Sequence, residues 1–496
     1  MTEISSTSSG SVKLSATLAI LLAALLLPLS FTGGVVTTPA ISQELHGGPL
    51  SLAWLTNGFM LTFGSGLLAA GVAADKLSHK RVFIAGLLLF ALSSLLIFLT
   101  QSAFALGVYR ALQGIAAAMT LAGGATALAH LHSGAARTRV FSLLGTLFGV
   151  GLAFGPLLMG VITDGFGWRW IYLLLALMAA LIAVISRYCL AAPQTFSSAR
   201  ADIIGTLLFS LALLALTTAL ILLPQYGVTA WPLLLCIALT LLAGWRFHRH
   251  TQRIAEPVFS LALLRQPHFA GVLLLPVATC YSYVVLLIII PLFLMGARQM
   301  SETQSAITLL SLTAPMLIFP GIAAWLTRWF SAANVSVFGL LLASAGLLGM
   351  AQAIPSTDIR LLGIAMFITG AGSALPWGLM DGLAVSAVSV ERAGMAAGLF
   401  NTVRVAGEGI ALAVVMIVLT QLNHWQLAQA LDATTRDAAA NWLAGSHLVE
   451  ASKLLPQISA NALMHHVQHA YQLLLYGLTA ITLICAGVIG FLLKRP

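Results

Sequence analysis

Charged side chains are scarce in this chain. Only 7% of its 496 residues are Asp, Glu, Lys or Arg, whereas 59% are hydrophobic, and the mean hydropathy is +1.00. A soluble domain carries roughly 25% charged residues, so this composition excludes one. Apolar runs of about 20 residues, long enough to cross the hydrocarbon core of a bilayer, recur from end to end. The sequence predicts an all-α membrane protein, since a β-barrel would instead show alternating segments of about 10 residues.

Cysteines and catalytic motifs are also few. The four cysteines are scattered through apolar runs, which favours neither a disulfide framework nor a zinc site. His465 and His469 have an i, i+4 spacing that metal sites use, but no carboxylate or cysteine lies near them in the sequence, and we expect no metal. Walker, H-E-x-x-H and G-x-S-x-G motifs are missing, so we expect no ATP hydrolysis, no enzymatic activity and no cofactor.

The apolar runs predict fourteen spans, which puts both termini on the same side of the membrane. We expect a tail at 1–13, a six-helix bundle at 14–190, a linker with two extra peripheral spans at 191–268, and a second six-helix bundle at 269–496. A polar segment at 422–470 is either an amphipathic lid on the bilayer surface or a plain connector. The predicted spans are 14–40, 52–74, 82–100, 104–129, 140–162, 170–190, 203–224, 231–247, 269–296, 305–326, 335–353, 359–386, 395–421 and 471–493.

The basic residues orient these spans. Sixteen of the 23 Lys and Arg residues fall in segments on the side of the termini, five fall on the opposite side, and Arg110 and Arg404 fall inside spans. Because cationic loops resist translocation, we expect both termini in the cytoplasm and the 422–470 segment in the periplasm of a bacterial inner membrane. The positive net charge thus needs no nucleic acid to explain it. We expect the bilayer and a small molecule as partners of a monomer.

Five motifs, each at a span boundary or inside a span, resemble those of the major facilitator superfamily, in its fourteen-helix drug/proton antiporter branch. They are GVAADKLSHKR at 71–81, YRALQGIAAA at 109–118, GLAFGPLLMG at 151–160, DGFGWRWIY at 164–172 and ERAGMAAGLFNTVR at 391–404. The resemblance implies two six-helix bundles that rock around a central cavity, with a proton gradient as the energy source. One departure is clear, because this branch typically has an acidic residue where Ser30 stands.

The resemblance assigns roles to two of the motifs. It implies a gating motif in which the acid can latch the two bundles together on the cytoplasmic side, and this motif comprises Gly71, Asp75, Lys76, Lys80 and Arg81. It also implies an antiporter hinge in which small residues let helices approach closely and bend, and this hinge comprises Gly151, Gly155, Pro156 and Gly160.

Four charged residues, Arg110, Asp381, Arg404 and Glu408, fall well inside predicted spans and not at their ends. Each costs roughly 2.5–3.5 kcal/mol at mid-bilayer on the insertion scale, so they must face water or one another. We expect Asp381 to meet Arg404, with Glu408 one helical turn deeper. Glu408 is then the first candidate for the proton-binding carboxylate, Asp381 the second, and Arg404 the cation that sets their pKa values. A static ion pair is the alternative, and the resemblance implies that Arg110 joins the proton relay.

Several polar and aromatic residues are candidates to line the substrate cavity, although each also fits ordinary helix packing. They are Asn57, Phe59, Gln113, Tyr281, Tyr283, Trp377 and Asn401.

The resemblance and the buried charges favour a proton-coupled antiporter that exports amphipathic or hydrophobic drugs. The alternative is a dedicated exporter of an endogenous metabolite such as a siderophore, and the missing acid at position 30 favours neutral or anionic cargo. A membrane sensor would need no charge cluster and would carry a soluble domain. Uptake is disfavoured because the Gly-Pro motif at 151–160 is typical of antiporters.

Overall fold

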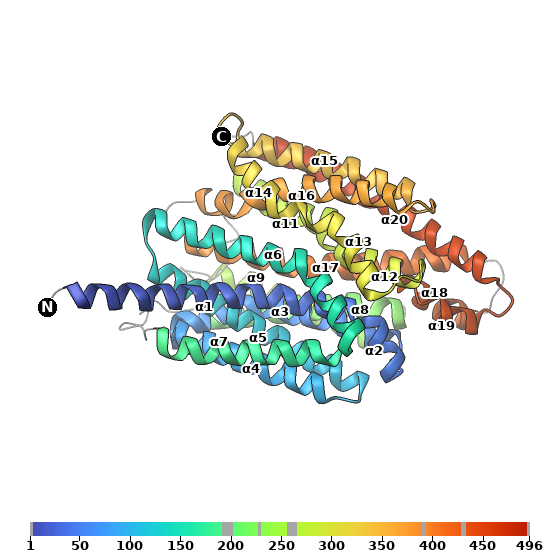
Figure 1. Ribbon diagram of the computed structural model, residues 1–496, viewed down its shortest axis with the longest axis horizontal. Coiled ribbons are helices and arrows are strands. Elements are labelled where there is room, and N and C mark those ends of the chain that lie inside the picture. The colour runs from blue at the N-terminus through green and yellow to red at the C-terminus, as the bar shows by residue number, and fades with distance from the viewer. Residues whose placement is uncertain are drawn as a thin grey trace.

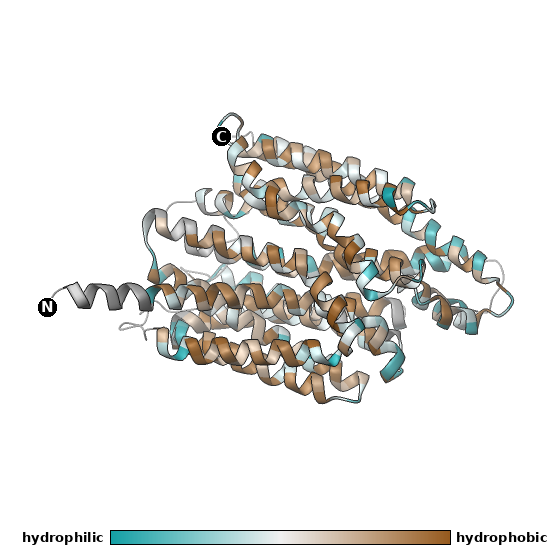
Figure 2. Cartoon of the chain, in the orientation of Figure 1, coloured by the Kyte–Doolittle hydropathy of each residue, from teal (hydrophilic) through white to brown (hydrophobic). Residues whose placement is uncertain are grey.

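The computed structural model describes residues 3–190, 202–226, 230–254, 265–387, 393–427 and 433–493. The regular structure within these ranges is helical, and fourteen helical segments are long and apolar enough to cross a membrane. The predicted fold class and number of spans are therefore confirmed. Figure 2 shows apolar residues along the long helices and hydrophilic ones gathered at their ends and in the short helices.

The first half of the chain supplies six of the spans. Proline inside a helix removes one backbone hydrogen bond, and two of these spans tolerate it, at Pro28 and Pro156. The helices are α1 (Glu3–Val36), α3 (Pro49–Leu77), α4 (His79–Leu99), α5 (Ala103–Leu131), α6 (Gly134–Phe166) and α7 (Arg169–Cys189), with the short α2 (Thr38–Leu45) between α1 and α3. α1 begins eleven residues before the predicted start at residue 14, because the Ser-rich tail continues the helix.

The second half supplies six more spans, two of which are built from consecutive helices. A π-helical turn, η1 (Cys280–Val284), joins α11 (Pro267–Thr279) to α12 (Leu286–Gly296), and α13 (Glu302–Thr313) runs into α14 (Pro315–Leu326). Single π-turns inside helices often mark functional sites. The other four are α15 (Ala332–Ala353), α16 (Ile359–Ser386), α17 (Ala393–Gln426) and α20 (Ala460–Leu493).

The two halves meet mainly along two helix pairs. α3 packs against α17 and α6 against α13. A Cβ added at Gly64 of α3 would lie 2.7 Å from the Cα of Ala406, so the first pair is in backbone contact. In the second pair, the Thr313 hydroxyl donates to the carbonyl of Ala153 at 2.8 Å. Figure 1 shows both termini at one end of the molecule, and α15 and α16 diverge from α1 toward that end.

The two extra spans form an antiparallel pair, α8 (Ile203–Tyr226) and α9 (Trp231–Thr251). Asp202 ties them together, since its carboxylate accepts from the Gly205 amide and pairs with His250, each at 2.7 Å. α9 lies on the outside, as expected for both spans. α8 departs from that expectation because it packs against α3 and α17, along the seam between the halves.

The described residues of the polar segment 422–470, which leave out 428–432, are mostly helical. α17 continues to Gln426 and α20 begins at Ala460, which leaves α18 (Ala433–Ala444) and α19 (Leu448–Leu454) as the connection. α18 packs against α17 and α8. The segment therefore covers the end of the molecule opposite the termini (Figure 1). Both sequence interpretations, a lid on the bilayer surface and a plain connector, miss this packing against the helix ends.

Candidate functional site

An arginine and two carboxyl groups lie where α16, α17 and α6 converge. Nη1 of Arg404 lies 3.4 Å from both carboxylate oxygens of Asp381, which confirms the predicted contact between α17 and α16. The guanidinium also lies 5.6 Å from the ring of Phe148, 5.8 Å from Trp377 and 6.0 Å from Phe400. Aromatic faces attract a cation within about 6 Å. The charge is thus held by one carboxylate and a shell of rings.

Asp381 and Arg404 differ in their access to water. The Arg404 side chain is 6% exposed, whereas that of Asp381 is 46% exposed, although Asp381 lies inside a predicted span. A Cβ added at Gly145 of α6 would lie 3.8 Å from a carboxylate oxygen of Asp381. Asp381 is therefore on the side of α16 that faces the other half of the molecule, near the end that carries the termini.

Glu408 follows one turn along α17. The residue is 5% exposed, and its Oε1 has no hydrogen-bond partner among the described residues. Cys280 of the π-turn lies beside it, with its Sγ 3.9 Å from the carbonyl oxygen of Arg404. An ionised carboxylate buried without a partner costs several kcal/mol, so a bound proton removes a large penalty at this position.

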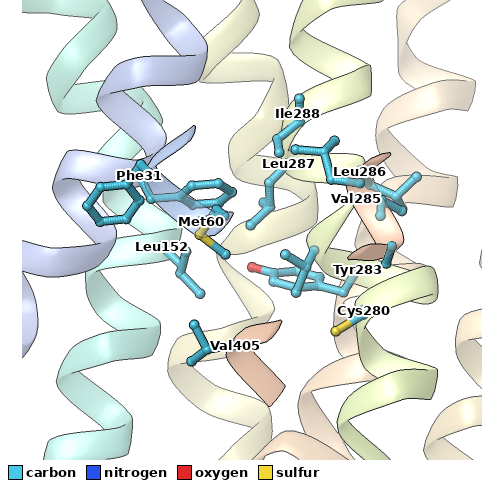
Figure 3. Packing of buried hydrophobic residues seen from close by; sticks show 14 of the residues in the cluster. Phe31, Met60, Leu152, Cys280, Tyr283, Val285, Leu286, Leu287, Ile288 and Val405 are labelled. Carbon is cyan, nitrogen blue, oxygen red and sulfur yellow. The ribbon is translucent and has the colours of Figure 1, made fainter. Parts of the chain in front are cut away.

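Apolar side chains from both halves meet at the level of the π-turn and form an apolar layer across the seam. Figure 3 shows Phe31 of α1, Met60 of α3 and Leu152 of α6 facing the second half, from which the Tyr283 ring points toward them. Tyr283 is fully buried, its ring lies 6.1 Å from that of Trp377, and its hydroxyl has no hydrogen-bond partner among the described residues. Two predicted cavity residues, Tyr283 and Trp377, therefore lie at the seam.

The first half holds its own buried arginine. Arg110 is 0% exposed, and its guanidinium donates to the carbonyl oxygens of Leu55 and Ser30, to the Ser30 hydroxyl and to Oε1 of Gln113, at 2.6–3.3 Å. The Phe59 ring lies 4.6 Å from the guanidinium carbon. Ser30 therefore occupies the place of a counter-ion, and the described contacts of Arg110 include no carboxylate.

Two predicted cavity residues belong to this cluster. Phe59 is in contact with Arg110, and the Gln113 amide also donates to the Ser94 hydroxyl at 2.7 Å. Both lie inside the first half and not at the seam. Of the remaining candidates, Tyr281 is half-buried near Cys485 of α20, and Asn401 is partly exposed on α17.

The residues of the hinge motif are at close helix contacts. A Cβ added at Gly151 would lie 2.4 Å from Pro28, and one at Gly155 would lie 2.1 Å from the Thr32 hydroxyl, so both sit against α1. One at Gly160 would lie 2.9 Å from the carbonyl oxygen of Glu302, in α13. The motif, with Pro156 in its middle, thus packs α6 against its own half at two points and against the other half at a third.

The gating motif lies at the end of α3 and the start of α4. The side chain of Asp75 is not among those that the structure describes, so its predicted latch stays a prediction. Lys80 donates to the carbonyl of Leu190 at the end of α7, within its own half, while Lys76 and Arg81 are exposed and Gly71 has open space beside it. Glu391 and Arg392, from the last motif, lie outside the described residues.

One further residue lines a cavity that lies on the other side of the apolar layer from Arg404. Asn57 of α3 is 4% exposed, and its Oδ1 has no hydrogen-bond partner among the described residues. The sequence named Asn57 as a candidate to line the substrate cavity. It gave no sign that residues of α18, such as Trp442, form the opposite wall.

Comparisons with known proteins agree with this architecture. The family model described as Major Facilitator Superfamily matches residues 19–412. The chain is 29% identical over 392 residues to the methylenomycin A resistance protein of Streptomyces coelicolor, covering 79% of this chain and 82% of that one. It is 26% identical over 408 residues to the tetracenomycin C resistance and export protein of Streptomyces glaucescens, covering 81% and 75%.

A third relative and a solved structure extend the comparison. The multidrug resistance protein Stp of Mycobacterium tuberculosis is 24% identical over 435 residues, covering 88% of this chain and 81% of that one. A crystal structure of a bacterial homologue of the human lysosomal transporter Spinster, inward-facing and unoccupied, superposes with a TM-score of 0.65 at 12% identity, covering 98% of this chain and 97% of that one. At this identity the likeness concerns the fold alone.

Proposed function

This chain belongs to the Major Facilitator Superfamily, a family of multi-pass membrane transporters, and from that premise we propose that it is a proton-coupled antiporter. It exports amphipathic or hydrophobic small molecules across the bacterial cytoplasmic membrane, with both termini in the cytoplasm. Support for export comes from the relatives, which are named for drug resistance and efflux. Support for the orientation comes from the excess of basic residues on the side of the termini.

The observation that supports the proton coupling is the buried carboxyl group of Glu408 next to Arg404, whose Oε1 has no hydrogen-bond partner in the described part of the chain. A proton taken up from outside neutralises Glu408 and lets it remain buried in the arrangement described here. When the cytoplasmic end is open, water reaching Asp381 and Arg404 offers a route for the proton to leave. The membrane potential supplies about 2.3 kcal/mol per charge for each 100 mV.

A second candidate function is export dedicated to one compound, such as an endogenous metabolite like a siderophore. Two of the relatives are each named for a single compound, methylenomycin A and tetracenomycin C. The cluster around Arg110 favours neutral or anionic cargo in either case, because Ser30 stands where an acid would attract cations.

The test uses a strain that lacks its own drug exporters and expresses this chain. Growth and cellular accumulation are measured with methylenomycin A, tetracenomycin C, neutral hydrophobic drugs and cationic dyes, with and without an uncoupler. We expect lower accumulation of neutral compounds, and we expect the uncoupler to abolish the difference.

The Glu408→Gln variant, which mimics a permanently protonated side chain, is expected to fold and to lose uncoupler-sensitive export. Glu450→Gln is the matched control, because Glu450 lies on α19 in an exposed pair with Lys453. Full export by Glu408→Gln would remove this residue from the mechanism, and energised accumulation inside the cell would reverse the direction.

A further inference from the structure

A cavity lies at the end of the molecule opposite the termini, beyond the apolar layer. It contains about 750 Å³ of space without atoms, part of it open to solvent. Its walls come from α2 and α3 of the first half, α12 and α17 of the second half, and the extra helix α8. Ile288 belongs both to this wall and to the apolar layer (Figure 3).

Helix α18 and the turn after it form the roof. Asn441, Trp442 and His447 line the cavity, and the His447 amide donates to the carbonyl of Trp442 at 3.0 Å. The roof is anchored to the second half, because the hydroxyls of Ser446 and Tyr471 are 3.1 Å apart and Ser446 lies against Gly296 of α12. A ligand inside would therefore touch both halves, α8 and the roof.

The polar groups of the cavity carry no formal charge. The described residues that line it include no Asp, Glu, Lys or Arg. Burial lowers the pKa of His447, against a smaller opposite effect of Glu450, so its imidazole is neutral at physiological pH. Apart from His447 and a few hydroxyl and amide groups, the lining is apolar, with Leu220 of α8 and Met416 of α17 among its side chains.

One polar group in the wall lacks a partner. Asn57 is more than nine-tenths buried, and its Oδ1 has no hydrogen bond to a described residue. Buried polar groups in native proteins are nearly always hydrogen-bonded, and an exception calls for an explanation. Because Asn57 lines the cavity, a bound molecule with an N–H or O–H donor would satisfy this oxygen.

From the cavity, its uncharged lining and the unpartnered oxygen, we propose a binding site for an uncharged, mainly apolar small molecule with one hydrogen-bond donor. The site lies under α18 and is separated from the Arg404 cluster by the apolar layer. It rests on the proposed export function, in which it holds the cargo on the outer side before release. The roof helix α18 and the seam helix α8 are then parts of the site and not only connections.

The test uses two fluorescent probes with the same anilinonaphthalene skeleton. N-phenyl-1-naphthylamine is uncharged and has one N–H donor, and 1-anilinonaphthalene-8-sulfonate adds a sulfonate to it. Their fluorescence is titrated against purified full-length protein in lipid nanodiscs, with empty nanodiscs as the blank. We expect saturable binding of the neutral probe and binding of the sulfonate at least tenfold weaker, because the cavity has no cation to pair with it.

Two variants locate the binding. Leu220→Trp fills the cavity from α8 and is expected to abolish saturable binding, while Leu234→Trp on the exposed face of α9 is the matched control. Asn57→Leu is expected to weaken binding about two- to tenfold, the worth of one neutral hydrogen bond, with no loss of thermal stability. Unchanged binding in both cavity variants, or equal binding of the two probes, would overturn the proposal.

The same titration separates this proposal from the proposed function. Glu408→Gln is expected to bind the neutral probe normally while it loses coupled export, because Glu408 does not line the cavity. If the wild-type chain binds the probe normally but exports nothing, the proposed export function is contradicted while the proposed binding site is still supported. Export by Leu220→Trp at the wild-type rate would show that the cargo does not pass through the cavity.

Discussion

Each half of the molecule buries one arginine inside a membrane span, and the two are held in different ways. Arg110 of the first half has only neutral partners among its described contacts, which are backbone carbonyls, a hydroxyl, an amide and the Phe59 ring. Arg404 of the second half has a carboxylate within 3.4 Å and a second, buried carboxyl group one helical turn away.

The difference teaches where a change of charge is feasible. The neutral partners of Arg110 cannot take up or release a proton in the physiological range, so the charge of that cluster is constant. Near Arg404, by contrast, lie two ionisable carboxyl groups, and Asp381 is half exposed to water. On this reading the first half is a fixed scaffold and the second half carries the variable charge. The predictions below test that division, beginning with the largest expected effect.

Removing each arginine should have opposite consequences. Arg110→Leu removes the guanidinium donor from the buried carbonyls of Leu55 and Ser30 and leaves the Gln113 amide oxygen with the Ser30 hydroxyl alone. Each lost hydrogen bond to the charged group is worth about 1.5–3 kcal/mol. We expect a clear fall in yield and in the midpoint of thermal unfolding. Arg404→Leu loses one long contact to a carboxylate that water can reach, so we expect nearly normal stability and no coupled export.

Both quantities are measured on the same preparations, by thermal unfolding in detergent and by export from cells. Arg110→Lys is the control that keeps the charge but cannot reproduce the fork of hydrogen bonds, and we expect it to be destabilised as well. If Arg110→Leu folds normally and only export is lost, the two arginines have the same role and the comparison fails.

A smaller effect should follow from neutralising Asp381. A half-exposed ion pair contributes at most about 1 kcal/mol, so Asp381→Asn is expected to lower the initial rate of export about fivefold and not to abolish it. The measurement is the export rate at several external pH values. Asp358→Asn is the control, since Asp358 caps the other end of the same helix by accepting from the Arg360 amide.

This variant also ranks the two carboxyl groups. If Asp381→Asn abolishes coupled export as completely as Glu408→Gln, Asp381 is the proton carrier, and Glu408 becomes a residue that supports the packing of α17.

The sequence predicted the parts of this arrangement that depend on hydropathy and helix geometry. The apolar runs located the fourteen spans, because only a helix of that length satisfies its backbone in lipid. The contact between Asp381 and Arg404 was predictable because two charges near the same end of antiparallel neighbouring spans must meet or face water.

Other parts could not be predicted, for physical reasons. Lipid is as apolar as a protein interior, so the sequence of α8 does not distinguish a helix at the seam from a peripheral one. In the same way, the sequence does not show that the Arg110 side chain points into the first half, so it does not show that Phe59 and Gln113 contact Arg110 there and do not line a cavity. The Ala-rich α18 has no apolar run, and its position over the cavity follows from tertiary contacts with α17 and α8 alone.

The smallest effect is expected from giving the buried arginine of the first half a carboxylate partner, as the arginine of the second half already has. The Ser30 hydroxyl accepts from Arg110 at 3.0 Å, so Ser30→Asp places a carboxylate against the guanidinium. The attraction gained is roughly offset by the desolvation of a second buried charge, and we expect export of neutral compounds to change by less than about twofold. Export of a cationic dye such as ethidium is expected to rise modestly, because the fixed positive charge that repels it is neutralised.

Ser30→Asn, which has the same size without the charge, should show no rise. Equal dye export by the two variants would mean that position 30 does not set the charge of the cargo. Loss of neutral export in Ser30→Asp alone would mean that Arg110 must stay without a counter-ion, so that the first half is more than a scaffold.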